Sequence, residues 1–307
     1  MCTTCGCSDT GGVTLTNLAT GRRQSLDGPA LAHELAHELV YRPLRGRRRL
    51  LEARALGHAL GHVPERAPAA PAATLIGIEQ DILSRNRRLA ERNRDWFAGR
   101  AILALNLMSS PGSGKTSVLE CTLRALGNEF AMHVIEGDQA TSNDAERIRA
   151  TGCVALQINT GTGCHLDAAM LARGLLELDP PRGAMVLIEN VGNLVCPALF
   201  DLGERAKVVI LSVTEGEDKP LKYPHMFKAS EVILLNKIDL LPYVRFDVER
   251  CVAHARQINP SLRVFCVSAQ TGEGMADWYG WLRGQYALAA VADSSDAGKH
   301  FPGNHLV

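Results

Sequence analysis

Short apolar runs alternate with polar turns and helix-length segments from about residue 101 onward. Each run is rich in Val, Ile and Leu, and most are followed by a segment with helical periodicity such as SNDAERIRATG or MADWYGWLRGQYALAA. Buried strands that alternate with helices predict an α/β fold with a mostly parallel, doubly wound sheet covered on both faces. The predicted strands are ILALNLM, MHVIEG, VALQIN, AMVLIEN, KVVILSV, EVILLNK and RVFCVSA.

The segment before these runs divides the chain. Residues 63–74 read VPERAPAAPAAT, which is typical of an extended linker. The following stretch, IEQDILSRNRRLAERNRDWF, predicts a helix whose apolar face carries Ile78, Ile82, Leu89 and Trp96. The sequence therefore predicts an N-terminal region over 1–62, a linker over 63–75, a main domain over 76–290 and a loose tail over 291–307.

Composition narrows the functional class. Of the 307 residues, 46% are hydrophobic and 21% are charged, which are globular values, and the formal net charge is zero. We expect no binding to nucleic acid or to a membrane surface, because no global charge field would support either. We find no apolar run of membrane-spanning length and no signal segment, and so expect a cytoplasmic protein. Nine cysteines in that compartment favour metal binding or core packing over disulfides.

A phosphate-binding loop is predicted at SSPGSGKT, residues 109–116, between the strand ILALNLM and the helix TSVLECTLRAL. Small residues let backbone N–H groups surround phosphate oxygens, Lys115 can reach the β- and γ-phosphates, and Thr116 can hold Mg²⁺. Ser109 stands where the usual motif has glycine. The predicted nucleotide contacts are Gly112, Ser113, Gly114, Lys115, Thr116 and Ser117.

NKID at 236–239 indicates a guanine site. The Asp239 carboxylate offers two acceptors to the N1–H and N2–H₂ donors of guanine, a donor pair that adenine lacks. Asn236 can add polar contacts and the Lys237 stem can cover the base, while Ser268 and Ala269 of SAQTGEG close the pocket. GTP is therefore expected rather than ATP.

Two further strand ends carry acidic residues that suit the γ-phosphate. Asp138 in IEGDQ and Glu189 in IENVGN are candidates for holding Mg²⁺ or orienting water, with Gly192 beside them. The alternative is that one of the two acids caps a helix or loop. No arginine is obviously placed to act on the phosphates, so slow hydrolysis is expected.

Two sets of cysteines suggest metal sites. MCTTCGC supplies Cys2, Cys5 and Cys7, whose thiolates suit Ni²⁺, Zn²⁺ or Cu⁺. The alternative is that these are incidental cysteines at a chain terminus. The second set is Cys164 and His165 in GCHLD with Cys196 in NLVCP. It would converge near the γ-phosphate if the strand ends meet, and buried structural cysteines are the alternative.

Histidine pairs also occur in the N-terminal region. HELAH at 33–37 matches a zinc-protease pattern and HALGH supplies His58 and His62. The region is too small for a protease, so auxiliary metal storage or plain helix surface is the better interpretation.

Together these motifs resemble the HypB family of GTPases, which assist nickel insertion during [NiFe]-hydrogenase maturation. The likeness is carried by the cysteine motif, SSPGSGKT, IEGDQ, GCHLD, IENVGNLVCP, EGEDKPLKYP and NKIDLLPY, over about residues 76–288 and the first seven. It implies a dimerising P-loop GTPase of the signal-recognition/MinD-like class. It also implies nickel at the first cysteine set, nickel or zinc at the second, and a phosphate contact from Lys219.

The same resemblance implies partners. These are a second copy of the chain, joined in response to GTP or metal, the small zinc-containing nickel chaperone of the pathway, and the hydrogenase large-subunit precursor. Many members carry a long histidine-rich stretch after the cysteines, whereas this chain has GGVTLTNLATGRRQSLDG, which argues against bulk nickel storage. The alternatives are a nickel GTPase serving urease, a metal buffer with weak nucleotide turnover, and a P-loop small-molecule kinase.

Overall fold

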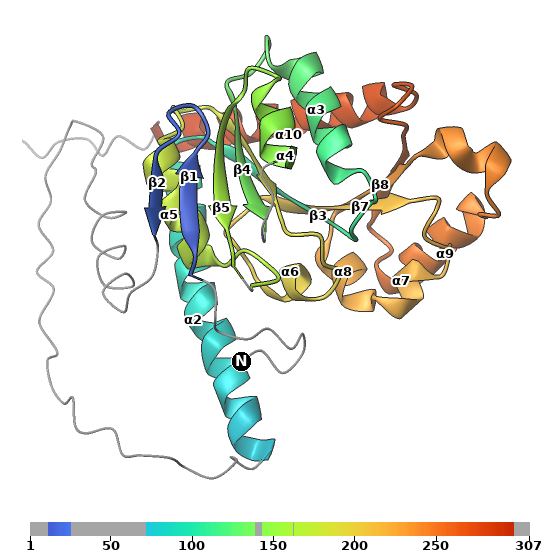
Figure 1. Cartoon of the computed structure of the whole chain (residues 1–307), viewed down its shortest axis with the longest axis horizontal. Helices are drawn as coiled ribbons and strands as arrows, with labels where there is room; N and C mark the ends of the chain where they lie inside the picture. Colours follow the sequence, from blue (N-terminus) through green and yellow to red (C-terminus); the bar gives the residue numbers. More distant parts are fainter. Residues whose placement is uncertain (1–11, 26–71, 139–142, 162, 298–307) are drawn as a thin grey trace, which may run out of the picture.

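A single mixed sheet of nine strands forms the centre of the molecule (Figure 1). The computed structural model describes residues 12–25, 72–138, 143–161 and 163–297. The strands are β1 (Thr14–Asn17), β2 (Arg23–Ser25), β3 (Leu103–Ser109), β4 (Met132–Asp138), β5 (Val154–Asn159), β6 (Met185–Glu189), β7 (Ala206–Ser212), β8 (Val232–Asn236) and β9 (Arg263–Cys266). The seven strands from β3 to β9 correspond to the seven predicted apolar runs, and the prediction of a mostly parallel α/β sheet is confirmed.

The strand order is β2-β1-β5-β4-β6-β3-β7-β8-β9. β3 lies between β6 and β7 and is parallel to both, so the loops that leave these three strands emerge together at one edge. β4 pairs with β6 in register, with Glu136 opposite Glu189. Ligand sites of open parallel sheets form at such carboxyl edges, where neighbouring connections run in opposite directions.

Helices cover both faces of the sheet (Figure 1). One apolar core joins the sheet to α3, α4 and α10, and two others join the opposite face to α2 and α5 and to α8 and α9. The helices are α2 (Ala72–Gly99), α3 (Lys115–Leu126), α4 (Asn143–Arg149), α5 (Ala168–Leu178), α6 (Cys196–Leu199), α7 (Lys219–Lys222), α8 (Pro224–Ala229), the 3₁₀ helix η1 (Ile238–Tyr243), α9 (Val248–Ile258) and α10 (Met275–Ala297).

Both ends of the main domain differ from the predicted limits in detail. α2 begins at Ala72, inside the segment assigned to the linker, because no proline follows Pro71 in that stretch. α10 continues to Ala297, past residue 290, since the next glycine or proline after Gly284 is Gly298. Residues 63–71 and 298–307 lie outside the described residues.

The β1–β2 hairpin is an element that the pattern did not predict. β1 pairs antiparallel with β2 and also with β5, with Thr14 opposite Asn159. Leu15 is buried against the core beside α2 and α5, whereas all three residues of β2 are exposed. The hairpin covers the edge of β5, and two strands from the segment before residue 62 thereby belong to the main sheet.

The predicted apolar face of α2 is confirmed only in part. Trp96 packs against the core and Leu89 is half-buried, whereas Ile82 is 48% exposed. The buried positions are Asn86, Ala90, Asn93 and Phe97. The Asn93 carboxamide is fully buried and donates to two backbone carbonyls, of Ala168 and Leu202, at 2.9 Å each. Periodicity counts asparagine as polar, so it misses a face that packs through side-chain hydrogen bonds to loops.

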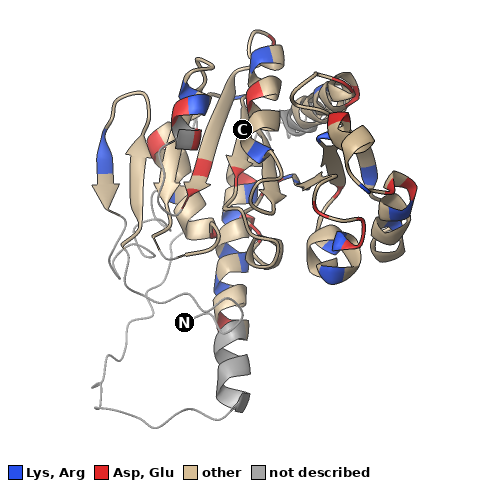
Figure 2. Cartoon of the chain, turned by 45° about the vertical axis from the view of Figure 1, so that its right-hand side comes forward, with Lys and Arg blue, Asp and Glu red and all other residues tan. Residues whose placement is uncertain are grey.

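Charges of both signs are interspersed along α2 and the shorter helices (Figure 2). This distribution agrees with the formal net charge of zero. Within the described part of the chain, none of the helices combines the length and apolar character that crossing a membrane requires.

Candidate functional site: a phosphate cavity beside a Cys–His–Cys cluster

The loop between β3 and α3 forms one wall of a cavity of about 550 Å³ at the carboxyl edge of the sheet. The cavity also receives the ends of β4 and β6 and the side chain of Lys237. Its lining comprises Ser109, Ser110, Pro111, Gly112, Ser113, Gly114, Lys115, Thr116, Ser117, Glu136, Gly137, Asp138, Asp144, Arg147, Glu189, Val191, Gly192 and Lys237. All the residues predicted from SSPGSGKT therefore line one cavity, at the N-terminus of α3, where backbone N–H groups and the helix dipole favour an anion.

Gly114 is the position where the loop needs glycine. Its φ is +94°, and a Cβ there would collide with the carboxamide of Asn236. That carboxamide donates to the Ser113 carbonyl at 3.0 Å and accepts from the Ala269 N–H at 3.1 Å. Asn236 thus ties the phosphate loop to the loop after β9, and a side chain at position 114 would break both contacts.

Lys237 contacts the same loop beside Asn236. Its ammonium donates to the Gly112 carbonyl at 2.6 Å, and its own backbone is left-handed, with φ of +64°. A non-glycine residue in that region is strained, and the surrounding contacts hold it there. The strand end of β8 is therefore locked against the phosphate loop.

Asp239 and Ser268 lie together as the NKID and SAQTGEG motifs predict. The Ser268 hydroxyl, which is fully buried, donates to Asp239 Oδ1 at 2.5 Å. The same hydroxyl accepts from the N–H groups of Gln270 and Thr271. The serine fixes the loop and orients the carboxylate that the motif offers to a base.

Two buried carboxylates face each other at the ends of β4 and β6. Glu189 accepts hydrogen bonds through Oε1 from the Lys115 ammonium at 2.6 Å and the Thr116 hydroxyl at 2.7 Å. Glu136 is 2% exposed, and burial, reinforced by the charge of Glu189, raises its pKa to about 9. Sequence reasoning chose Asp138 in IEGDQ and missed Glu136, although a carboxylate two residues earlier on a strand points to the same face.

The donor set at this point suits a divalent cation. Within the described residues, the Oε2 atoms of Glu136 and Glu189 are buried without a hydrogen-bond partner. The Thr116 hydroxyl adds a third oxygen beside them, and Mg²⁺ takes oxygen ligands of these kinds. The residues present therefore fit a magnesium ion at the phosphate loop.

Arg147 of α4 is a second residue that the sequence did not indicate. Its guanidinium lines the cavity and donates to the Ser117 hydroxyl at 3.0 Å and to Glu120 at 2.7 Å. The sequence showed no arginine obviously placed to act on the phosphates, because Arg147 lies thirty positions after Ser117. The parallel sheet brings α4 back beside α3.

Lys219, by contrast, is linked to the phosphate loop only indirectly, through the side chain of Glu215. Its ammonium lies 3.4 Å from Glu215 and 5.1 Å from the centre of the Tyr223 ring. Glu215 in turn accepts a hydrogen bond from the Ser110 hydroxyl. Lys219 is not among the residues that line the cavity.

Cys164, His165 and Cys196 form a cluster, as the second cysteine set predicted. Their ligand atoms all lie within 4.8 Å of one another, and both thiols are buried. The His165 ring packs on Phe200, with ring centres 3.9 Å apart, and burial lowers the pKa of the imidazole, which favours the neutral form that binds metals. Metal–ligand bonds of about 2.0–2.3 Å place two ligands up to roughly 4.6 Å apart, so the cluster is close to the geometry of a metal centre.

The cavity and the cluster share one connection. Glu189 ends β6, Val191 and Gly192 line the phosphate cavity, and Cys196 begins α6 only a few residues later. The remaining predicted metal ligands, Cys2, Cys5 and Cys7, and the histidine pairs of residues 33–37 and 58–62 lie outside the described residues.

Comparisons with known proteins agree with this arrangement. Residues 103–266 match the family model described as CobW/HypB/UreG, nucleotide-binding domain. The chain is 50% identical to hydrogenase maturation factor HypB of Azotobacter chroococcum over 287 residues, which is 93% of this chain and 92% of the relative. It is 58% identical to HypB of Escherichia coli over 219 residues, covering 71% and 76% of the two chains.

A solved structure gives the same result. The crystal structure of HypB from Helicobacter pylori in complex with nickel superposes with a TM-score of 0.62 at 36% identity, covering 66% of this chain and 96% of that one. Residues 103–266, the segment that the family model matches, contain both the phosphate cavity and the Cys–His–Cys cluster. The chain therefore belongs to the HypB family, with a nucleotide-binding domain of the CobW/HypB/UreG type.

Proposed function

We propose that the chain is a GTP-hydrolysing metallochaperone that binds nickel and assists its insertion into the large subunit of a [NiFe]-hydrogenase. The observation that carries this proposal is the shared β6–α6 connection, which supplies Glu189 to the phosphate cavity and Cys196 to the thiol–imidazole cluster. The names of the relatives, hydrogenase maturation factors, and the nickel in the related crystal structure support it.

For hydrolysis, the chain's own residues bind, orient and stabilise. Lys115 leaves its ion pair with Glu189 to bind the β- and γ-phosphates, while Gly112, Ser113, Gly114 and Ser117 surround the phosphates from the loop and α3. Mg²⁺ at Thr116 and the neighbouring carboxylates would neutralise charge that develops on the phosphates. Glu189 and Asp138, which line the cavity, would then orient the attacking water, and Gly192 from the same lining would lie beside the γ-phosphate.

Selectivity for guanine would rest on the β8 and β9 ends. Asp239, held by Ser268, accepts from the base edge, Asn236 and Ala269 close the pocket, and Lys237 covers the base. Lys219 would act on phosphate across a dimer, because within its own chain Glu215 holds it.

Nickel is the cargo. Two thiolates and a neutral imidazole from Cys164, His165 and Cys196 suit Ni²⁺ and also Zn²⁺, and three ligands leave a coordination position open for transfer. Cys2, Cys5 and Cys7 are proposed as a second nickel site. Contacts of the γ-phosphate would order the β6–α6 connection and so set the positions of the ligands in the cluster. Hydrolysis would remove these contacts and release the bound metal.

Partners follow from this cycle. We propose a homodimer promoted by GTP or metal, the small zinc-containing nickel chaperone of the pathway, and the hydrogenase large-subunit precursor. Leu240, Leu241 and Val244, candidates for a dimer face, pack partly against the α8–α9 core, while Tyr243 between them is 84% exposed.

The test is nickel titration and GTP turnover on the full chain, reduced and with Mg²⁺. Replacement of Cys196 by Ala should remove one nickel equivalent and leave single-turnover hydrolysis intact, whereas Lys115→Ala should abolish hydrolysis. Hydrolysis without any nickel binding would reduce the chain to a GTPase, and binding without hydrolysis would make it a metal buffer.

A further inference from the structure

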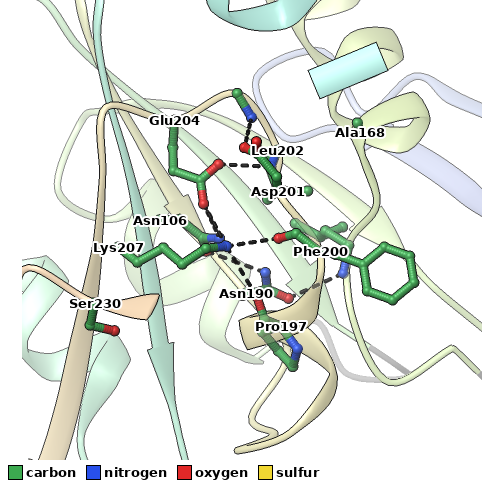
Figure 3. A network of polar contacts seen from close by, with 12 residues as sticks. Asn106, Ala168, Asn190, Pro197, Phe200, Asp201, Leu202, Glu204, Lys207 and Ser230 are labelled. Carbon is green, nitrogen blue, oxygen red and sulfur yellow. Dashed lines mark hydrogen bonds and ion pairs between the residues drawn. The ribbon is translucent and has the colours of Figure 1, made fainter. Parts of the chain in front are cut away.

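A buried polar network connects the central strands of the sheet with α6 (Figure 3). The Asn190 carboxamide donates to Asn106 Oδ1 at 3.2 Å, and the Asn106 carboxamide donates to Glu204 Oε1 at 3.1 Å. Lys207 pairs with the same Glu204 oxygen at 2.7 Å. Both asparagines are fully buried, Glu204 is 6% exposed, and the Lys207 side chain is 11% exposed.

One end of this network holds α6. The Lys207 ammonium donates to the carbonyl of Phe200 at 2.7 Å and to that of Pro197 at 3.2 Å (Figure 3). Pro197 lies within the single turn that Cys196 begins and Phe200 is the residue that caps its end, and the Phe200 ring covers His165. A helix of four residues cannot satisfy its own last carbonyls and has little stability of its own, so Lys207 supplies what the turn lacks.

The other end holds the segment that carries the remaining two ligands. Asn190 Oδ1 accepts from the Leu166 N–H at 3.1 Å and from the Val191 N–H at 3.0 Å. Leu166 directly follows His165, and Val191 lines the phosphate cavity. The two halves of the cluster are therefore placed relative to each other through one set of side chains on β3, β7 and the β6 end.

Fold stability alone does not require a buried ion pair at this place. Apolar replacements of buried ion pairs are often neutral or stabilising, because desolvation of both charges opposes their attraction. What an apolar side chain cannot do is donate to two carbonyls on α6 at once. The ammonium of Lys207, fixed by Glu204, sets the position of the turn that begins at Cys196.

We propose that Lys207 is a positioning residue for the metal-binding cluster, holding α6 so that Cys196 meets Cys164 and His165. The inference rests on the proposed function, because it concerns the same metal site. Lys207 acts through the backbone of α6, because its ammonium donates to the carbonyls of Pro197 and Phe200. Groups that orient metal ligands in this way typically change affinity by about 10–100-fold when they are removed.

The experiment uses the full chain with Cys2, Cys5 and Cys7 replaced by alanine, so that nickel reports on the cluster alone. Lys207→Met is expected to weaken nickel binding by about 10-fold or more and to alter the thiolate-to-nickel charge-transfer spectrum. Thermal stability should fall, because Lys207→Met leaves the buried Glu204 charge unpaired, whereas GTP affinity should stay near the parent value. Lys207→Arg should recover most of the nickel affinity. Arg205→Met is the matched control. Arg205 is two residues before Lys207 and is an exposed cation paired with Glu231, so its replacement should leave nickel affinity and the spectrum unchanged.

Unchanged affinity and spectrum in Lys207→Met would overturn the inference. A loss of affinity that tracks a loss of stability and that Lys207→Arg does not restore would also overturn it, since the role would then be structural only. If Lys207→Met does not fold, Glu204→Leu together with Lys207→Met removes both charges and should still weaken nickel binding. If Cys196→Ala binds nickel as the parent does, the proposed function fails and this inference fails with it. If Cys196→Ala loses nickel and Lys207→Met does not, only this inference fails.

Discussion

The buried carboxylate of Glu136 should make the stability of the nucleotide-free protein depend on pH. Burial first, and then the charge of Glu189, raise the pKa of Glu136 from 4.5 to about 9 in the folded chain. The folded state therefore binds this proton more tightly than the unfolded state does. The stabilisation is fully present below pH about 4.5 and is lost as pH rises toward 9.

The magnitude follows from proton linkage. Between the two pKa values the folded chain holds one more proton, so Glu136 lowers the free energy of unfolding by about 1.4 kcal/mol per pH unit. Glu136→Gln removes this slope, because the carboxamide keeps the shape without the ionisation. From pH 6 to pH 8 the variant should therefore gain about 2.7 kcal/mol relative to the wild type.

Urea unfolding at pH 6, 7 and 8, with chelator and without nucleotide, measures this difference. Glu146→Gln, at an exposed position on α4, is the control and should run parallel to the wild type. Parallel curves for the wild type and Glu136→Gln would refute the reasoning, because Glu136 would then have the same pKa folded and unfolded. Adding Mg²⁺ should flatten the wild-type slope, since a cation favours both ionised carboxylates.

Three further predictions test other parts of the site. Asp239→Asn should weaken GTP binding by about 100-fold and favour xanthosine triphosphate, whose 2-oxo group accepts from the new amide, as competition binding would report. Arg147→Ala should weaken GTP and GDP alike by about 10-fold in calorimetry, because its guanidinium lines the cavity beside Ser117; an unchanged affinity would exclude a phosphate contact. Asn93→Ala removes two buried hydrogen bonds and should lower the free energy of unfolding by about 2–3 kcal/mol in urea, with GTP affinity unchanged.

The parallel strands and the phosphate loop could be predicted because their signals are local. β3, β4 and β6 are buried on both faces and read as continuous apolar runs, and Lys115 sits between a strand and a helix in the printed order. Cys164 and Cys196 could be paired as one site only by assuming that strand ends meet, which the parallel sheet brings about.

The rest could not be predicted because its determinants are long-range. β2 has no buried residue, so its sequence carries no alternating pattern, and the hairpin depends on pairing with β5. Asn93 on α2 looks like a solvent position until the carbonyls that it meets, more than seventy residues away, are known. Lys207 is a different case, because its partners Glu204, Phe200 and Pro197 lie only three, seven and ten residues earlier, and no sequence motif marks a side chain that donates to the carbonyls of α6.

The direction of β1 limits how far the N-terminal cysteines can lie from the sheet. Thr14 pairs with Asn159 at the carboxyl end of β5, the strand whose loop continues to Cys164. Thr14 is the seventh residue after Cys7, and a chain of that length spans at most about 25 Å. Under the nickel role proposed above, this upper limit bounds the distance between the first cysteine set and the edge of the sheet that leads to Cys164.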